Sequence, residues 1–257
     1  MNKKKAFWRF ISVISIIIFI CSGAYLIKNV FHDDSGDGQD FRNTQLQDES
    51  HSVPNAKDDH GIQWTKLRKK NPDVYAWIYI PDTNVDYPVL QSGNGKDDFF
   101  YLDHNLEKKA SAAGAIYSEM QNATDFSDPV TVLYGHNMAD GSMFASLHKF
   151  RDAKFFKKHK YLYIYTPEKK YTYYIYSTYV YDNRHLLNSF DFSDKKVFKE
   201  YLKTTQNPLS TVVNTRSLKK AGIHLSTNSK IITLSTCTKS YEGDTRYLVQ
   251  GVLIKNE

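Results

Sequence analysis

Two neighbouring segments of this chain, Tyr161–Tyr165 (YLYIY) and Tyr171–Tyr181 (YTYYIYSTYVY), show the alternating pattern of β-strands. They are rich in aromatic and β-branched residues, which favour an extended, pleated backbone. The five residues that join them, Thr166-Pro-Glu-Lys-Lys170, suit a short turn. This stretch therefore predicts a β-hairpin with strong β propensity.

Six further segments have the length and composition of short strands. They are Val74–Ile80, Val85–Leu90, Ala115–Ser118, Val130–Tyr134, Lys230–Thr236 and Arg246–Ile254. Helical patterns are confined to Gly61–Lys70 and to residues 142–158 and 194–206, so strands and helices do not alternate regularly. Together with the hairpin, these patterns predict one mostly β domain over residues 61–257, with eight strands in a closed barrel rather than a doubly wound sheet.

The distribution of charge argues against a nucleic-acid partner. The 257-residue chain has a formal net charge of +6, but residues 1–32 contain five of its 34 basic residues and none of its 28 acidic ones. The remaining 29 basic and 28 acidic residues leave a charge of +1 for the rest of the chain. Nucleic-acid binding needs a concentrated positive surface. We therefore expect the tyrosines of the hairpin to serve in packing rather than in stacking on bases.

The first 60 residues predict a membrane anchor followed by a linker. Phe10–Ile27 has no formal charge, and as a helix its 18 residues would span about 27 Å, close to the thickness of a bilayer's hydrocarbon core. The basic residues before it place residues 1–9 in the cytoplasm and the main domain outside the cell. Residues 28–60 are acidic and polar and predict a flexible linker. The alternative is a cleaved signal peptide, which Ser22-Gly23-Ala24 would suit only weakly.

Cys237 is the residue on which the expected chemistry depends. The other cysteine, Cys21, lies in the predicted span and cannot pair with a thiol outside the membrane. Cys237 stands at the end of an apolar strand pattern, just before a polar turn, where a rigid support displays reactive groups. The alternative is a small, buried, inert side chain. A nucleophilic thiol would need a group that transfers protons and a donor for the oxyanion.

His136 and Arg246 are the candidates for these two tasks. His136 follows the strand Val130–Tyr134, and Gly135 between them would permit an unusual backbone conformation. Arg246 begins the next strand nine residues after Cys237, so the returning chain would bring its guanidinium beside the thiol. A solvated surface charge is the alternative for this arginine. Four other histidines are expected at the surface: His148, His159, His185 and His224.

The candidate residues occur within short motifs, Thr233-Leu-Ser-Thr-Cys237 before Arg246 and Tyr134-Gly-His136 about a hundred residues earlier. These motifs resemble the class B sortases, which are cysteine transpeptidases of Gram-positive cell surfaces. The resemblance covers about residues 61–254. Its other blocks are Asn71-Pro-Asp-Val-Tyr-Ala-Trp-Ile-Tyr-Ile-Pro81, Val85-Asp-Tyr-Pro-Val89, Tyr101-Leu-Asp-His-Asn-Leu106, Gly141-Ser-Met-Phe144 and the helical stretch 194–206.

The resemblance implies a sortase-type barrel with an N-terminal helix and a helix between its sixth and seventh strands. It also implies that Cys237 is the nucleophile, His136 the general acid and base, and Arg246 the donor to the oxyanion or the substrate carbonyl. Substrate-binding positions are implied for three further residues: Ser235, Thr236 and Tyr134. No metal or organic cofactor is implied, and the sequence has no zinc-binding spacing such as H-E-x-x-H or C-x-x-C.

The implied reaction has two protein or peptide partners and takes place at the membrane. A secreted protein would be cleaved after the threonine of a C-terminal sorting motif, and the resulting thioester would be transferred to the amine of a cell-wall precursor peptide. The segment Asp182–Phe192, where the family has its substrate-facing loop, matches no pattern and leaves the motif preference open. Two alternatives remain, a thiol protease that only hydrolyses and an inert anchored binding module. Papain-like proteases place the cysteine before the histidine, whereas here His136 precedes Cys237.

Overall fold

Our computed structural model describes three stretches of the chain: residues 60–93, 97–239 and 245–257. The predicted cytoplasmic tail 1–9 and membrane span 10–27 lie outside the described residues, as does the predicted linker 28–60 except for its last residue. Among the residues that are described, no helix is both long enough and apolar enough to cross a membrane.

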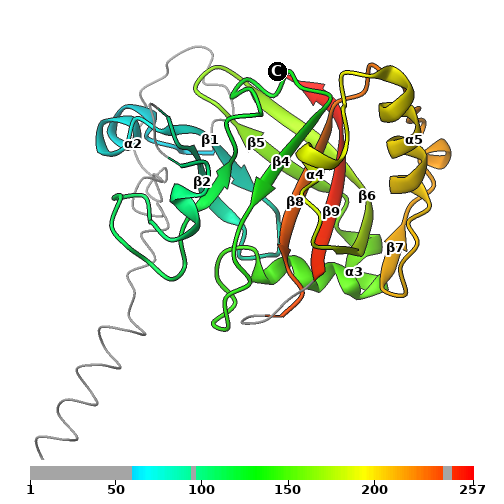
Figure 1. Ribbon diagram of the computed structural model, residues 1–257, viewed down its shortest axis with the longest axis horizontal. Helices are drawn as coiled ribbons and strands as arrows, with labels where there is room; N and C mark the ends of the chain where they lie inside the picture. The colour runs from blue at the N-terminus through cyan, green and yellow to red at the C-terminus, as the bar shows by residue number, and fades with distance from the viewer. Residues whose placement is uncertain (1–59, 94–96, 240–244) are drawn as a thin grey trace, which may run out of the picture. The chain divides into compact units, whose positions relative to one another are not determined.

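Within these residues nine strands form one sheet, and eight of them close into a barrel (Figure 1). The order along the sheet is β5-β1-β2-β3-β4-β8-β9-β6-β7, and the additional pairing of β5 with β6 closes the ring. The strands are β1 (Val74–Tyr79), β2 (Asp86–Gln91), β3 (Ile116–Ser118), β4 (Val130–Tyr134), β5 (Tyr161–Tyr165), β6 (Lys170–Asp182), β7 (Val213–Thr215), β8 (Ile231–Cys237) and β9 (Thr245–Asn256).

The predicted eight-stranded barrel is confirmed, and each predicted segment overlaps one strand of the ring. The barrel is mixed, since β2 pairs with β3 and β4 with β8 in parallel, whereas the other neighbours are antiparallel. β7, which pairs with β6 outside the ring, was not predicted. Its three residues are too few to show a period, and two of them are exposed, so the sequence carries no burial signal there.

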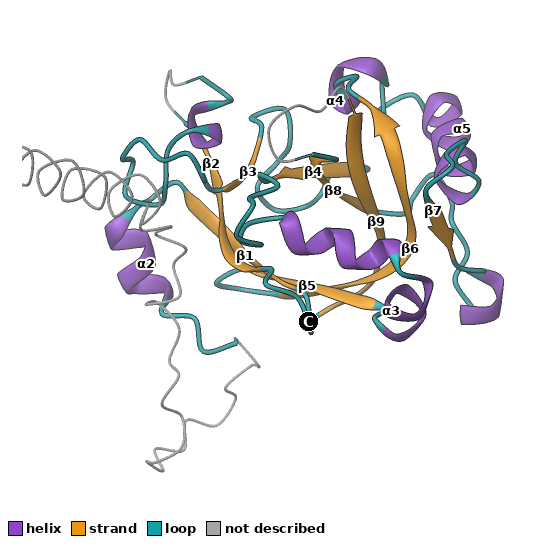
Figure 2. Ribbon diagram, turned by 90° about the horizontal axis from the view of Figure 1, so that it is seen from below, coloured by secondary structure: helices purple, strands orange, loops and turns teal. Residues whose placement is uncertain are grey.

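Helices occupy connections between the strands. Two of the three predicted helices have nearly the predicted bounds: α2 (Trp64–Lys70) and α5 (Lys195–Gln206). α5 follows β6, as predicted for the helix between the sixth and seventh barrel strands, and it lies beside β7 in both views (Figures 1 and 2). Three short helices were not predicted: η2 (Phe100–Leu102), α4 (Leu186–Ser189) and η4 (Lys219–Ala221).

The third predicted helix, over residues 142–158, is divided into two. η3 (Ala145–Arg151) is a 3-10 helix, and α3 (Ala153–Lys158) is an α-helix. Between them Asp152 has an extended backbone, and its side chain accepts a hydrogen bond from the N–H of Phe155. An aspartate in this position starts a new helix. The apolar spacing continues across the break, which is why the sequence pattern predicted one helix.

The interior of the barrel is filled by one apolar cluster to which all eight strands of the ring contribute. Alternate residues of a strand point to opposite faces of the sheet. Tyr171, Tyr173 and Ile175 of β6 belong to the interior cluster, whereas Tyr174 and Tyr176 belong to a second cluster that includes the buried face of α5. The tyrosines of β6 therefore pack into two cores, as the near-neutral charge led us to expect.

Candidate active site

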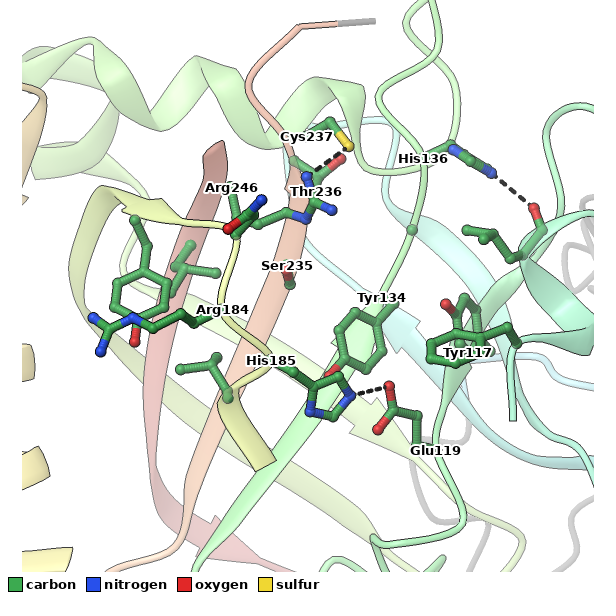
Figure 3. Close-up of a pocket in the computed structure, with 17 residues that line it drawn as sticks. Tyr117, Glu119, Tyr134, His136, Arg184, His185, Ser235, Thr236, Cys237 and Arg246 are labelled. Carbon is green, nitrogen blue, oxygen red and sulfur yellow. Dashed lines mark hydrogen bonds and ion pairs between the residues drawn. The ribbon is translucent and has the colours of Figure 1, made fainter. Parts of the chain in front are cut away.

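Cys237 and Arg246 lie side by side at one end of the barrel (Figure 3). Cys237 is the last residue of β8, and the antiparallel register pairs it with Arg246, the second residue of β9. The Nη1 of Arg246 donates a hydrogen bond to the Sγ of Cys237 over 3.4 Å. The cysteine is half-buried, so its thiol is held in place and still partly accessible. The register of one strand pair thus places a permanent positive charge beside the thiol.

His136 reaches the same cleft through the parallel pairing of β4 with β8. Tyr134 is paired with Ser235. His136 and Cys237 each follow two residues later, so the parallel direction of the two segments brings them to the same end of the sheet. The Nε2 of His136 lies 2.7 Å from the carbonyl oxygen of Leu102, and because a carbonyl only accepts, Nε2 carries the hydrogen. In the neutral ring Nδ1 is then the nitrogen that can take up a proton. Figure 3 shows it on the side of the ring nearer to Cys237.

Gly135 is needed for space rather than for an unusual backbone conformation. Its φ is not in the left-handed region, so the expectation from the sequence was wrong on this point. A Cβ at this position would come within 2.5 Å of Cδ1 of Ile116 and 2.8 Å of the Phe144 ring. The Gly135 N–H also donates to the carbonyl of Ser235 at 3.2 Å, which extends the pairing beyond β4. The missing side chain allows the segment that carries His136 to run close against the core.

The cleft is lined by all six residues predicted for the site, including Cys237, His136 and Arg246. Tyr134 stacks on Tyr117, with ring centroids 5.4 Å apart. Two of the lining residues expose very little of their surface: Ser235 (5%) and Thr236 (2%). Further lining comes from the end of β6 and the segment after it: Tyr181, Asn183, Arg184, His185 and Leu186.

Two side chains that the sequence did not single out hold the backbone of Cys237. The Nδ2 of Asn137 donates to the Cys237 carbonyl at 3.1 Å, and the Nε2 of His148 lies 3.1 Å from the same oxygen. Asn137 directly follows His136, whereas His148 comes from η3. A donor to a distant backbone carbonyl leaves no pattern in the sequence, which is why both residues were missed. Together they fix the end of β8, at the residue that carries the thiol.

Three of the four histidines expected at the surface are only half-buried. These three have specific partners: the Cys237 carbonyl for His148, the Asp82 carboxylate for His159 at 2.7 Å, and the Glu119 carboxylate for His185 at 2.6 Å. His224 is exposed, as expected. The residues next to a histidine in the sequence do not reveal which distant group will reach it. Within the described part of the chain, no group of three or more His, Cys, Asp or Glu side chains could hold a metal ion.

His148 is a half-buried neutral base. Burial lowers the pKa of its imidazole, the nearby positive charge of Arg151 lowers it further, and the hydrogen bond to the Cys237 carbonyl opposes the shift. Its Nδ1 is buried and has no hydrogen-bond partner among the described residues. A second proton on the ring would therefore have no acceptor, so the neutral form with the hydrogen on Nε2 suits this position.

The cleft holds the groups that acyl transfer through a thioester requires. A thiol can attack a carbonyl, an imidazole can exchange protons with the leaving and entering groups, and a guanidinium can stabilise the oxyanion between them. The fold and the cleft together thus define a barrel equipped as a cysteine acyltransferase.

Comparison with known proteins agrees with this class. Residues 78–254 match the model of the sortase domain. Sortase B of Listeria monocytogenes is 35% identical over 190 residues, which are 73% of this chain and 72% of the relative, and sortase B of Staphylococcus aureus is 26% identical over 248 residues, 96% of each chain. The chain therefore belongs to the sortase family, a family of cell-wall sorting transpeptidases, and its relatives place it in class B.

Solved structures support the same assignment. The crystal structure of Clostridium perfringens sortase B has a TM-score of 0.65 and 35% identity, and the match covers 75% of this chain and 100% of that one. The complex of Staphylococcus aureus sortase B with a substrate has a TM-score of 0.64 and 29% identity, and the match covers 75% of this chain and 85% of that one. The resemblance inferred from the sequence motifs is confirmed.

Acidification should weaken the fold through His148. Because folding lowers the pKa of this residue, the unfolded chain takes up the proton more readily. Its contribution to the free energy of unfolding is complete above the unfolded pKa of about 6.5 and is lost as the pH falls toward the lower folded value. His148→Gln keeps a donor for the Cys237 carbonyl but removes the titrating group, so its unfolding should depend less on pH.

This difference is measured by urea unfolding of the full-length chain in detergent, followed by circular dichroism at pH values above and below about 6.5. His224→Gln, a substitution of the same type at an exposed position, should keep the pH dependence of the wild type. An unchanged pH dependence in His148→Gln would contradict the assignment of a neutral, half-buried His148.

Proposed function

We propose that this chain cleaves a secreted protein after the threonine of a C-terminal sorting motif and transfers it to the amine of a cell-wall precursor peptide. The contact between Arg246 and Cys237, in a cleft that His136 also lines, is the observation that carries the proposal. The Staphylococcus aureus relative was solved with a substrate, which supports a peptide of this kind as the ligand of the cleft. The sortase fold supplies the remaining support.

In the first half-reaction, the Cys237 thiol gives its proton to His136, and the resulting thiolate forms a bond to the carbonyl carbon of the threonine. The carbonyl electrons move to the oxygen, and the Arg246 guanidinium donates hydrogen bonds to the resulting oxyanion. When the tetrahedral intermediate collapses, the carbon–nitrogen bond breaks and His136 gives a proton to the leaving amine. The products are a thioester on Cys237 and the released C-terminal peptide.

In the second half-reaction, the amine of the wall peptide attacks the thioester. His136, now neutral, takes the proton from that amine, and Arg246 again stabilises the oxyanion. The carbon–sulfur bond breaks, which returns the Cys237 thiolate and leaves a new amide bond. Water in place of the amine would give hydrolysis, the reaction of the alternative thiol protease. A test of the proposal therefore needs an amine acceptor.

Replacing the thiol should stop both half-reactions. Cys237→Ala should abolish the cleavage of sorting-motif peptides and their transfer to an amine, because the covalent intermediate cannot form. Cys21→Ala in the predicted span is the matched control and should react as the wild type does. Mass spectrometry of a peptide panel, with and without an amine acceptor, gives the measurement. Substantial cleavage by Cys237→Ala would refute the mechanism, and wild-type hydrolysis without any transfer would favour the protease.

The geometry of the Arg246 side chain should matter as well as its charge. Loss of one donor to an oxyanion typically costs about 2.7–4 kcal/mol, which is about 10²–10³ in rate, and we expect Arg246→Ala to lose at least this much in single-turnover rate. Arg246→Lys should recover only part of the loss, because an ammonium group cannot reproduce the planar fork of the guanidinium.

Arg68→Ala, at an exposed position on α2, serves as the control for the removal of an arginine. Circular dichroism establishes that each variant folds. If Arg246→Ala reacted within about threefold of the wild-type rate, Arg246 would be a surface charge without a role in the reaction.

We also propose that the chain is anchored by residues 10–27, with residues 1–9 in the cytoplasm and the barrel domain outside the cell. The support is the uncharged apolar stretch Phe10–Ile27 and the basic residues before it. The full-length protein should remain in the membrane fraction, and protease added to intact cells should reach the barrel domain. A mature N-terminus near residue 25 would show instead that a signal peptidase removes the span.

A further inference from the structure

The segment after β6 forms a wall of the cleft, and two polar contacts attach it to the chain after β3. We use the term substrate-facing wall for residues 183–189, which include α4. The Nε2 of His185 lies 2.6 Å from Oε1 of Glu119, and the Nε2 of Gln121 donates to Oδ1 of Asn188 at 2.9 Å. The wall lies within Asp182–Phe192, the segment in which the sequence matched no pattern of the family, and these contacts determine where it stands.

The hydrogen bonds of His185 define which nitrogen carries the hydrogen. Its Nδ1 accepts a hydrogen bond from the backbone N–H of Asn188 at 3.2 Å, at the start of α4. Nδ1 must therefore be unprotonated, and the hydrogen of the neutral ring is on Nε2, where it is donated to Glu119. One imidazole thus links the first turn of α4 to a carboxylate on the opposite side of the cleft.

Stability alone does not account for Glu119. Its side chain is only 2% exposed, and the carboxyl faces the hydroxyl of Tyr134 as well as the imidazole of His185. Burial raises the pKa of this carboxyl, the hydrogen bond from His185 lowers it, and the charge of Asp98 raises it again. Removing a carboxyl from water costs free energy, and buried ionic pairs contribute little net stability. The role of Glu119 therefore lies in its contact with His185.

We propose that Glu119 and His185 form a latch that positions the substrate-facing wall and thereby sets the affinity of the cleft for its peptide. This inference rests on the proposed function and extends it to the selection of substrate. Both residues line the cleft together with Cys237. Figure 3 shows their contact beyond Tyr134, at a distance along the cleft from the thiol. The latch consists of positioning residues that act on the bound peptide through the wall, and neither residue bonds to the reacting groups.

Opening the latch should therefore weaken peptide binding and leave the chemistry of the thiol unchanged. Glu119→Ala and His185→Ala should each raise KM for the best peptide by about tenfold, with kcat within about threefold of the wild type. His185→Gln should restore most of the affinity, because an amide can still donate to Glu119. The double variant should be no worse than either single variant, since both remove the same contact. His224→Ala, at an exposed position, is the matched control.

The experiment uses the full-length chain in detergent and three readouts. Peptide kinetics give KM and kcat, iodoacetamide gives the alkylation rate of Cys237, and hydrogen exchange gives the protection of the amides of Asn188 and Ser189. The last two readouts need no turnover. Failure of the proposed function would appear as a wild type that turns over no peptide, and the latch would then be judged on hydrogen exchange and alkylation alone.

The latch predicts faster exchange of these two amides in both alanine variants, with unchanged alkylation of Cys237. Where Glu119→Ala does not fold, as judged by circular dichroism, His185→Ala decides the question, because this side chain is 26% exposed. Three results would each overturn the proposal: KM within about twofold of the wild type, a loss confined to kcat, or unchanged exchange in the wall.

Discussion

The register of β8 between its two neighbours is the constraint on which the site depends. Its parallel pairing with β4 determines where His136 leaves the sheet, and its antiparallel pairing with β9 sets Arg246 opposite Cys237. A shift by one residue would turn the thiol to the other face of the sheet. Ile232 and Leu234 fill the barrel interior, and the same shift would turn both side chains away from it. Their burial therefore stabilises the observed register. The apolar core thus sets the geometry of the cleft.

Polar contacts add a second level of control, and they act on different parts of the cleft. Asn137 and His148 bind the carbonyl of Cys237 and fix the backbone that carries the thiol. Glu119 binds His185 and fixes the opposite wall. Buried donors and acceptors are costly to leave unpaired, so each contact favours one arrangement over its alternatives. The first pair holds the residue that carries the thiol, and the second holds a wall of the cleft.

The barrel and the connections between its strands therefore contribute differently to function. The sortase fold accounts for a thiol, an imidazole and a guanidinium at the end of adjacent strands. The substrate-facing wall belongs to a connection, and connections tolerate changes that strands of a packed core do not. In this chain the buried carboxyl of Glu119 connects the substrate-facing wall to the segment after β3.

The sequence by itself determined the eight strands of the ring, because alternation and β propensity are local properties of a chain. It also drew attention to Cys237, His136 and Arg246, since each of these residue types carries its chemistry wherever it stands and each follows or begins a strand. Only the tertiary structure revealed β7 and the partners of His148 and His185. His148 meets the Cys237 carbonyl across 89 positions of the chain, and His185 meets its carboxylate across 66. Neighbouring residues carry no record of such contacts, so the fold alone decides them.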